Sequence, residues 1–191
     1  MTSMRPRMLL LAGAALLAAC TTAPPAPPQP AFDARAAVAA VRAAGGAESS
    51  ELDVRPLRDT QVEDLREDAL RLEREGKDAE AAAALDQALA INAEDPALLQ
   101  ERAEVALLMR QADAAEQFAR RAIGLGSQVG PLCRRHWETV AQAIDMRGHA
   151  ATPAGRNQDA AAQAEAATRQ SAIQQARQKR DACTVAAPPR Y

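Results

Sequence analysis

The chain has 191 residues, with 23 basic and 25 acidic side chains and a formal net charge of −2. This length fits one domain, and the near-balance of charge excludes the strongly basic surface that nucleic-acid-binding proteins use. Only 2% of the residues are aromatic, so a core must be built from aliphatic side chains, chiefly alanine, which favours the helix. We expect helices that pack closely but bury little area per residue.

The first twenty residues have the composition of a secretory signal. Arg5 and Arg7 form a short positive segment, an apolar run covers residues 8–19, and small residues come directly before Cys20. The run is shorter than the roughly 20 apolar residues that a transmembrane helix needs. Residues 1–19 are therefore predicted to be a signal peptide.

The segment Leu17-Ala18-Ala19-Cys20 resembles the lipobox of bacterial lipoproteins. The resemblance implies cleavage before Cys20, diacylation of Cys20 and acylation of the new amino terminus, so that several acyl chains hold the protein on a membrane. By the same resemblance, Thr21 in place of aspartate favours the outer membrane, with the protein facing the periplasm, over the inner membrane. The alternative is an ordinary signal peptide in which Cys20 is incidental.

A proline-rich linker and a short helix follow the signal. Residues 20–31 combine Cys20 with the sequence TTAPPAPPQPA, which favours an extended polyproline II spacer of up to about 30 Å. Residues 32–59 are predicted to hold a helix, capped by Asp33 and ended by Gly45, and then an extended segment at 51–57.

Helical patterns continue over residues 60–148, and each is bounded by residues that start or stop helices. Thr60 and Glu63 form a capping-box pattern at the first start, and Asp95 with Pro96 forms a strong start in the middle of the region. The predicted helices end at Gly76, about Asn92, about Arg110, Gly126 and Gly148. A last helix is predicted within residues 149–182, from about Asn157 to Ala182, and a loose tail over 183–191.

The helices form two pairs that match at an offset of 34 residues. The matching positions are apolar, and several are small: Leu65 and Leu99, Ala69 and Ala103, Ala81 and Ala115, Ala88 and Ala122, and Leu89 and Ile123. This period and pattern resemble the tetratricopeptide repeat over about residues 62–127. The resemblance implies an all-α array of antiparallel helix pairs, with about two repeats, a degenerate third unit and capping helices.

The chain departs from the tetratricopeptide pattern at several positions. The glycine between paired helices is present as Gly76, but Arg110 stands there in the second pair. A third unit would place Cys133 and Trp137 where the first two units have leucine and alanine, and a tryptophan cannot make the same close helix crossing. We therefore interpret the third unit as degenerate. The alternative is a generic alanine-rich bundle with an accidental period.

Tetratricopeptide arrays bind extended or helical segments of partners along a concave face, which is lined by the first helix of each pair. Carried over to this chain, the resemblance implies that the partner-binding residues are Arg66, Leu70, Glu73, Gln100, Glu104, Leu107, Leu108, Arg134 and Glu138. The alternative is that most of these residues are ordinary surface and that Leu107 or Leu108 serves the core. No cofactor is predicted.

Cys133 and Cys183 are the two cysteines besides Cys20. Export to an oxidising compartment favours a disulfide between them, with two free buried thiols as the alternative. A zinc site of Cys133, His136, His149 and Cys183 is disfavoured. Cys133 and His136 lie three residues apart, but the other two ligands lack motif spacing, so no metal site is predicted. A continuous C-terminal helix would overshoot Cys133, so we expect it to break or fold back.

No enzyme motif is visible: the chain has no Gly-rich phosphate loop, no G-x-S-x-G and no H-E-x-x-H. Its acidic residues lie at helical spacing from arginines, which is typical of a solvated helix face. We therefore expect a monomeric, non-enzymatic adaptor in envelope assembly, which binds an envelope protein and no nucleic acid. The alternative is a spacer whose alanine-rich helices self-associate.

Overall fold

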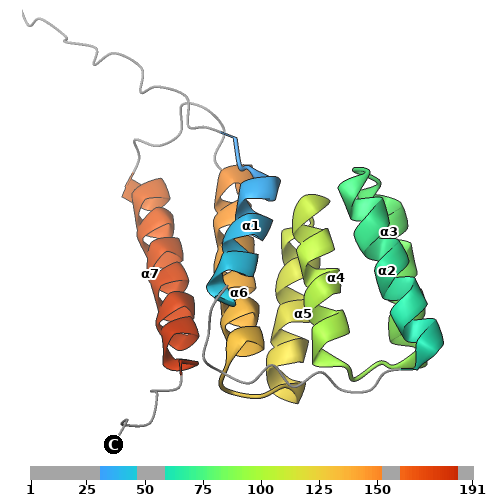
Figure 1. The fold of residues 1–191 in the computed structure, drawn as a ribbon. Helices are drawn as coiled ribbons and strands as arrows, with labels where there is room; N and C mark the ends of the chain where they lie inside the picture. The colour runs from blue at the N-terminus through green and yellow to red at the C-terminus, as the bar shows by residue number, and fades with distance from the viewer. Residues whose placement is uncertain (1–30, 47–58, 152–159, 185–191) are drawn as a thin grey trace, which may run out of the picture.

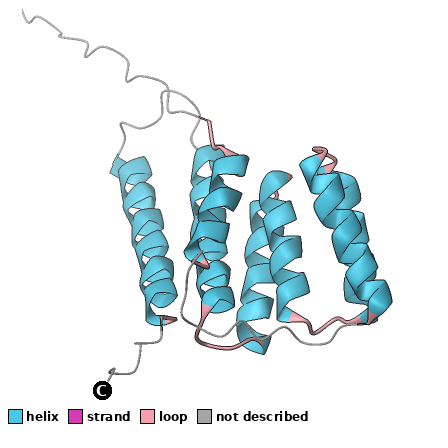
Figure 2. Cartoon of the chain, in the orientation of Figure 1, coloured by secondary structure: helices cyan, strands magenta, loops and turns pink. Residues whose placement is uncertain are grey.

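A computed structural model describes residues 31–46, 59–151 and 160–184, which form seven α-helices and no β-strand (Figure 1, Figure 2). The helices are α1 (Ala34–Ala44), α2 (Thr60–Arg74), α3 (Asp78–Ile91), α4 (Pro96–Leu108), α5 (Ala112–Leu125), α6 (Pro131–Ala151) and α7 (Ala160–Ala182). The predicted all-α fold is confirmed. Among the described residues, no helix is both long and apolar enough to cross a bilayer. Cys20, the proline-rich linker and the predicted extended segment at 51–57 lie outside the described residues.

Six of the described helices form three antiparallel pairs that stand side by side, α2 with α3, α4 with α5, and α6 with α7 (Figure 1). Neighbouring pairs contact each other through α3 and α4 and through α5 and α6. The first of the described helices, α1, packs on α4 and α6. We call the face on which α1 lies, formed by α2, α4 and α6, the groove face.

The 34-residue period of the sequence is also a period of the structure. Helices α3 and α5 have 14 residues each, and both their first and their last residues are 34 positions apart. The equivalent alanines of the two pairs are all buried, namely Ala69 and Ala103, Ala81 and Ala115, and Ala88 and Ala122. The structure is therefore consistent with a helical-repeat array, and the agreement disfavours an accidental period.

The turns inside the first two pairs hold a left-handed residue at the same repeat position. Gly76 has a φ of +75° between α2 and α3, and Arg110 has a φ of +59° between α4 and α5. In both turns the next backbone N–H donates a hydrogen bond of 2.9 Å to a carbonyl of the preceding helix. Glycine adopts this conformation without a clash, whereas another residue pays about 1–2 kcal/mol. Arg110 thus keeps the turn of the repeat, although its side chain strains it.

Two helix starts lie where the sequence predicts them. The Asp33 carboxylate accepts a hydrogen bond from the backbone N–H of Ala36 at the start of α1. The Asp95 carboxylate accepts hydrogen bonds from the N–H groups of Ala97 and Leu98 at the start of α4. Each aspartate satisfies N–H groups that have no partner within the helix.

Two other helix boundaries differ from the prediction. The N-cap of α2 is Asp59, whose carboxylate accepts a 2.8 Å hydrogen bond from the Gln61 N–H, so Thr60 is already helical and forms no capping box. Gly148 does not stop α6, which continues to Ala151. A Cβ at this position would overlap the end of the flexible Arg169 side chain of α7, which would have to shift.

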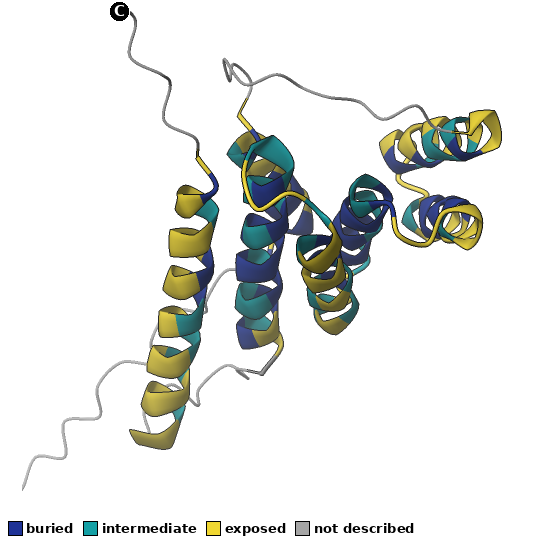
Figure 3. Cartoon of the chain, turned by 90° about the horizontal axis from the view of Figure 1, so that it is seen from below, coloured by how far each residue is buried: buried dark blue, intermediate teal, exposed yellow. Residues whose placement is uncertain are grey.

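The core is made largely of alanine and is divided among three contact clusters. One cluster joins α2, α3 and α4, a second joins α1 to α4 and α6, and a third joins α4, α5, α6 and α7. Buried positions are concentrated on α4 and α6, whereas α7 exposes one long side (Figure 3). Because each alanine buries little apolar area, the buried polar contacts and the disulfide hold a larger part of the fold together.

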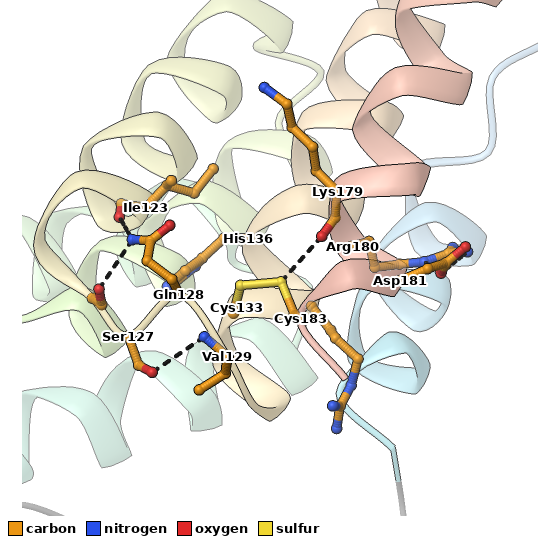
Figure 4. Close-up of a disulfide and its surroundings, with 12 residues drawn as sticks. Ile123, Ser127, Gln128, Val129, Cys133, His136, Lys179, Arg180, Asp181 and Cys183 are labelled. Carbon is orange, nitrogen blue, oxygen red and sulfur yellow. Dashed lines mark hydrogen bonds and ion pairs between the residues drawn. A yellow bond between two sulfur atoms is a disulfide. The ribbon is translucent and has the colours of Figure 1, made fainter. Parts of the chain in front are cut away.

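A disulfide joins Cys133, in the first turn of α6, to Cys183, the residue after α7 (Figure 4). Their Cα atoms are 5.9 Å apart. This is the pairing expected from the sequence. The expectation that the last helix breaks or folds back is wrong, because α6 runs through Gly148 and, at 21 residues, nearly matches the 23 residues of α7.

Replacing Arg110 with glycine is expected to raise the free energy of unfolding by about 0.5–1 kcal/mol, because the relief of left-handed strain exceeds the entropy that glycine adds to the unfolded chain. The matched change Gly76→Ala, at the same repeat position, is expected to lower it by about 1 kcal/mol. Urea unfolding measures both changes. An Arg110→Gly chain no more stable than the unchanged one would show that the turn carries no strain.

Replacing both Cys133 and Cys183 with serine is expected to lower the free energy of unfolding by about 2–4 kcal/mol, since the disulfide closes a long loop of the unfolded chain. Hydrogen exchange should show that the lost protection is concentrated in α7. Reduction of the unchanged chain serves as the control and should give the same loss. If neither treatment moves the urea midpoint, packing on α6 alone holds α7 in place.

Candidate functional site

The nine predicted partner-binding residues lie on the three helices of the groove face. Leu70 is 37% exposed, and Arg66 and Arg134 are partly buried. The other six are buried and are not exposed to a partner in this structure: Glu73, Gln100, Glu104, Leu107, Leu108 and Glu138. The physical reason is that helices of the same chain cover them, since α1 packs on α4 and α6 and α7 packs on α6.

The apolar part of the contact with α1 is a stripe of small side chains. Four α1 residues at helical spacing are buried, namely Ala34, Ala37, Val38 and Val41, together with Phe32 just before the helix. They share a cluster with Leu107 and Leu108 of α4 and with Ala143 and Met146 of α6. The two leucines therefore belong to the core, as the alternative interpretation of the sequence had it.

The polar part of this contact centres on Arg42, the residue after the apolar stripe. Its Nε donates to Glu104 Oε2 at 2.8 Å, and its Nη2 donates to Glu73 Oε2 at 2.7 Å. Burial lowers the pKa of Arg42, but the hydrogen bonds and charges of the two glutamates outweigh burial, and the net effect is a raised pKa. Arg42 thus remains charged and connects α1 to both α2 and α4.

Another arginine, Arg134, holds the C-terminal end of α1. Arg134 of α6 donates from Nε to the Ala44 carbonyl at 3.1 Å and from Nη2 to the Gly45 carbonyl at 2.9 Å. These are carbonyls at a helix end, which lack partners within the helix. Five of the predicted partner-binding residues thus contact α1, namely Glu73, Glu104, Leu107, Leu108 and Arg134.

A buried polar network lies directly behind the Arg42 contact. Gln100 donates from Nε2 to Glu104 Oε1 at 2.8 Å and to Thr139 Oγ1 at 2.9 Å, and its Oε1 lies 2.7 Å from His136 Nδ1. Since the amide oxygen can only accept, Nδ1 carries the proton of this bond. Burial first, and then the charge of Arg135, lowers the pKa of His136 to about 3. The imidazole is therefore neutral over the physiological range.

Glu138 serves the opposite side of α6. Its Oε2 accepts from Arg180 Nη1 at 2.6 Å, and its Oε1 accepts from Gln142 at 2.8 Å and lies 3.6 Å from Arg177. Two of these partners belong to α7, so Glu138 fixes the terminal helix to α6 together with the disulfide. It is a residue of the helix–helix contact and not of a partner-binding face.

The groove face remains accessible at its α2 end. Arg66 Nε donates to Glu101 Oε2 at 2.8 Å, and the exposed side chain of Leu70 lies beside this pair. A partly open cavity of about 10 Å³ lies there between Arg42, Arg66, Leu70 and neighbouring side chains. Such a volume holds about one water molecule, so it is no pocket for a small-molecule substrate.

Sequence reasoning missed Arg42 and the helix that carries it as part of the groove face. The available signal is the amphipathic pattern of residues 34–42, with an apolar stripe at Ala34, Ala37, Val38 and Val41 and an arginine directly after it. The pattern predicts that α1 buries one face, but not which surface it covers.

Comparison of the chain with models of known protein families, with curated proteins and with solved structures found no significant match.

The stability of the protein is expected to fall as the pH drops from 7 to 5 because of His136. Its folded-state pKa of about 3 lies below the ordinary 6.5, so in this range the unfolded chain binds a proton that the folded chain refuses. The loss is at most about 2 kcal/mol by pH 5, and it disappears above pH 6.5. His136→Gln, measured by urea unfolding, should remove most of this dependence.

The matched control is His149→Gln on the same helix, where the imidazole is part-exposed. Comparing the two variants separates the effect of the buried imidazole of His136 from that of a part-exposed imidazole on the same helix. If the stability of the His136→Gln chain falls with pH as steeply as that of the unchanged chain, groups other than His136 cause the loss.

Proposed function

We propose that this protein is a lipid-anchored adaptor of the bacterial outer membrane, which faces the periplasm and binds another envelope protein through its helical-repeat array. One observation carries the binding proposal. The groove face already holds a helix, α1, and five of the nine residues that the tetratricopeptide resemblance assigns to partner binding contact it. A face that recognises one helix in this way is suited to recognise helices of other proteins.

The recognition chemistry of the groove face supports a helical ligand. Leu107 and Leu108 offer an apolar floor, Glu73 and Glu104 offer negative charge to a basic side chain, and Arg134 offers donors to carbonyls at a helix end. These three elements match the apolar face, the flanking charge and the terminus of an amphipathic helix. We therefore propose a protein ligand and not a small molecule.

The same contacts support binding over catalysis. The Glu104 carboxylate accepts hydrogen bonds from Arg42, Arg135 and Gln100, and Glu138 is occupied by Arg180 and Gln142. Donors of the same chain thus occupy both oxygens of each carboxylate, which leaves little room for a substrate. The buried carboxylates of this face thus have structural partners in place of a catalytic environment.

Two features support an envelope location. The first twenty residues have the layout of a lipoprotein signal, with Cys20 as the acceptor of lipid. A disulfide between Cys133 and Cys183 is suited to an oxidising compartment such as the periplasm. The proline-rich residues 21–31 are long enough to place the folded part up to about 30 Å from the membrane.

The alternative, a spacer that self-associates through its last helix, has less support. The buried apolar residues of α7, Ile173 and Ala176, pack on α6 of the same chain. The side of α7 that remains exposed consists of alanine and polar residues such as glutamine and lysine. Such a surface offers little apolar area to a second copy.

Crosslinking in cells, followed by capture of the tagged chain from membranes, tests the binding proposal. Leu70→Asp should reduce the yield of the crosslinked partner at least tenfold, because Leu70 is the exposed leucine at the open end of the groove face. The matched control is Leu125→Asp on α5, which changes an equally exposed leucine away from the groove face and should leave the yield unchanged. Glu104 and Leu107 are unsuitable for this test because they are buried.

In the same cells, Cys20→Ser should move the protein from the membrane to the soluble periplasmic fraction, since the change removes the site of lipid attachment. Retention of the Cys20→Ser chain on the membrane would contradict the lipid anchor. If only self-crosslinks appear in both leucine variants, the adaptor proposal is wrong and the spacer becomes the better explanation.

A further inference from the structure

Helix α1 is attached to the groove face as a bound ligand would be, and less firmly than a helix of the core. It has 11 residues, and isolated helices of fewer than about 12–15 residues are marginal in water. Its helix depends on docking, while its docking side chains are alanine and valine, which bury less area than the leucines of α4. The helix is therefore expected to be among the first elements to open.

The chain connectivity allows α1 to leave the groove face without disturbing the array. Residues 45–59 join α1 to α2, and a chain of this length can reach about 50 Å when extended. The three helix pairs contact one another through α3–α4, α4–α6 and α5–α6, and none of these contacts involves α1. Departure of α1 would thus uncover the groove face while the pairs stay connected.

The charges beneath α1 define what can replace it. Glu104 would still have Arg135 and Gln100 as partners, but the carboxylate of Glu73 has its hydrogen bond from Arg42. Leaving a largely buried carboxylate without its cation is costly. The groove face is therefore stable when a helix places a guanidinium beside Glu73, whether that helix is α1 or belongs to another protein.

We propose that α1 is a displaceable occupant of the groove face and that the partner competes with it by supplying a similar helix. The ligand is an amphipathic helix of another envelope protein, with small apolar residues at positions i, i+3, i+4 and i+7 and an arginine at i+8. It ends two or three residues later, where Arg134 takes the last carbonyls. This inference rests on the proposed function, and it deepens it by naming the chemistry of the partner.

Hydrogen exchange of the unchanged mature chain tests whether α1 opens on its own. Amides of α1 should exchange at least tenfold faster than those of α4, because α1 undocks without unfolding of the repeat pairs. Equal protection of α1 and α4 would overturn the proposal, since α1 would then open only with the whole domain.

A competition experiment tests the ligand chemistry with a labelled synthetic peptide of residues 31–46. The receptor is the mature chain carrying Val41→Asp, which weakens its own α1 because Val41 is fully buried in the docked helix. The peptide should bind this receptor at least tenfold more tightly than it binds the unchanged chain. A peptide carrying Arg42→Glu should bind at least tenfold more weakly, and the control peptide Ala39→Glu, altered on the exposed side, should bind as the unaltered one does.

The remaining outcomes separate this inference from the proposed function. A Val41→Asp receptor that folds, as judged by circular dichroism, but binds no peptide overturns the inference. If that receptor does not fold, the exchange measurement alone decides. A concentration-dependent dimer of the unchanged chain that is lost in Val41→Asp would overturn the assignment to another protein, because the ligand would then be α1 of a second copy. If a partner is captured in cells but the peptide does not bind the receptor, the adaptor proposal is supported and the displaceable helix is overturned. If the peptide binds but no partner is captured, only the helix-binding site is supported.

Discussion

The arrangement of this protein depends on one buried carboxylate. Glu104 is 1% exposed, and its two oxygens join three elements, since Arg42 comes from α1, Arg135 from α6 and Gln100 from α4 itself. A charge in this position is tolerated only when its partners are in place. Because alanine-rich helices can slide on one another with little change in buried area, a directional contact of this kind fixes how α1 sits on the array.

The two ends of the array are closed by different means. At the α7 end, Glu138 and the disulfide hold the last helix on α6, so that end is fixed by charge and by a covalent bond. At the other end, the α2–α3 pair contacts the rest mainly through α4, and the exposed Leu70 remains beside a small cavity. The groove face between them is covered by α1, which packs on α4 and α6.

The sequence was sufficient where structure is decided locally or by repetition. The caps at Asp33 and Asp95 depend on neighbouring residues, and the 34-residue period places equivalent alanines at equivalent crossings. The burial of Glu104 and Gln100 was not predictable in the same way. Glu104 is paired with Arg42 of α1, 62 residues earlier, and Gln100 with Thr139 and His136 of α6, and no local pattern encodes these matches. Gly148 was misread for a related reason, since the side chain nearest to it, Arg169, belongs to another helix.

The position of α1 at the start of the folded part also has a mechanical consequence. The described residues begin just before α1, so tension applied to the chain ahead of Phe32 reaches α1 before it reaches any repeat pair. The load would be borne first by the contacts of α1: its small apolar side chains, the buried Phe32, and the arginines that join it to the array, Arg35, Arg42 and Arg134. By connectivity alone, the helix that covers the groove face is the described element that yields first when the chain is pulled from its amino-terminal side.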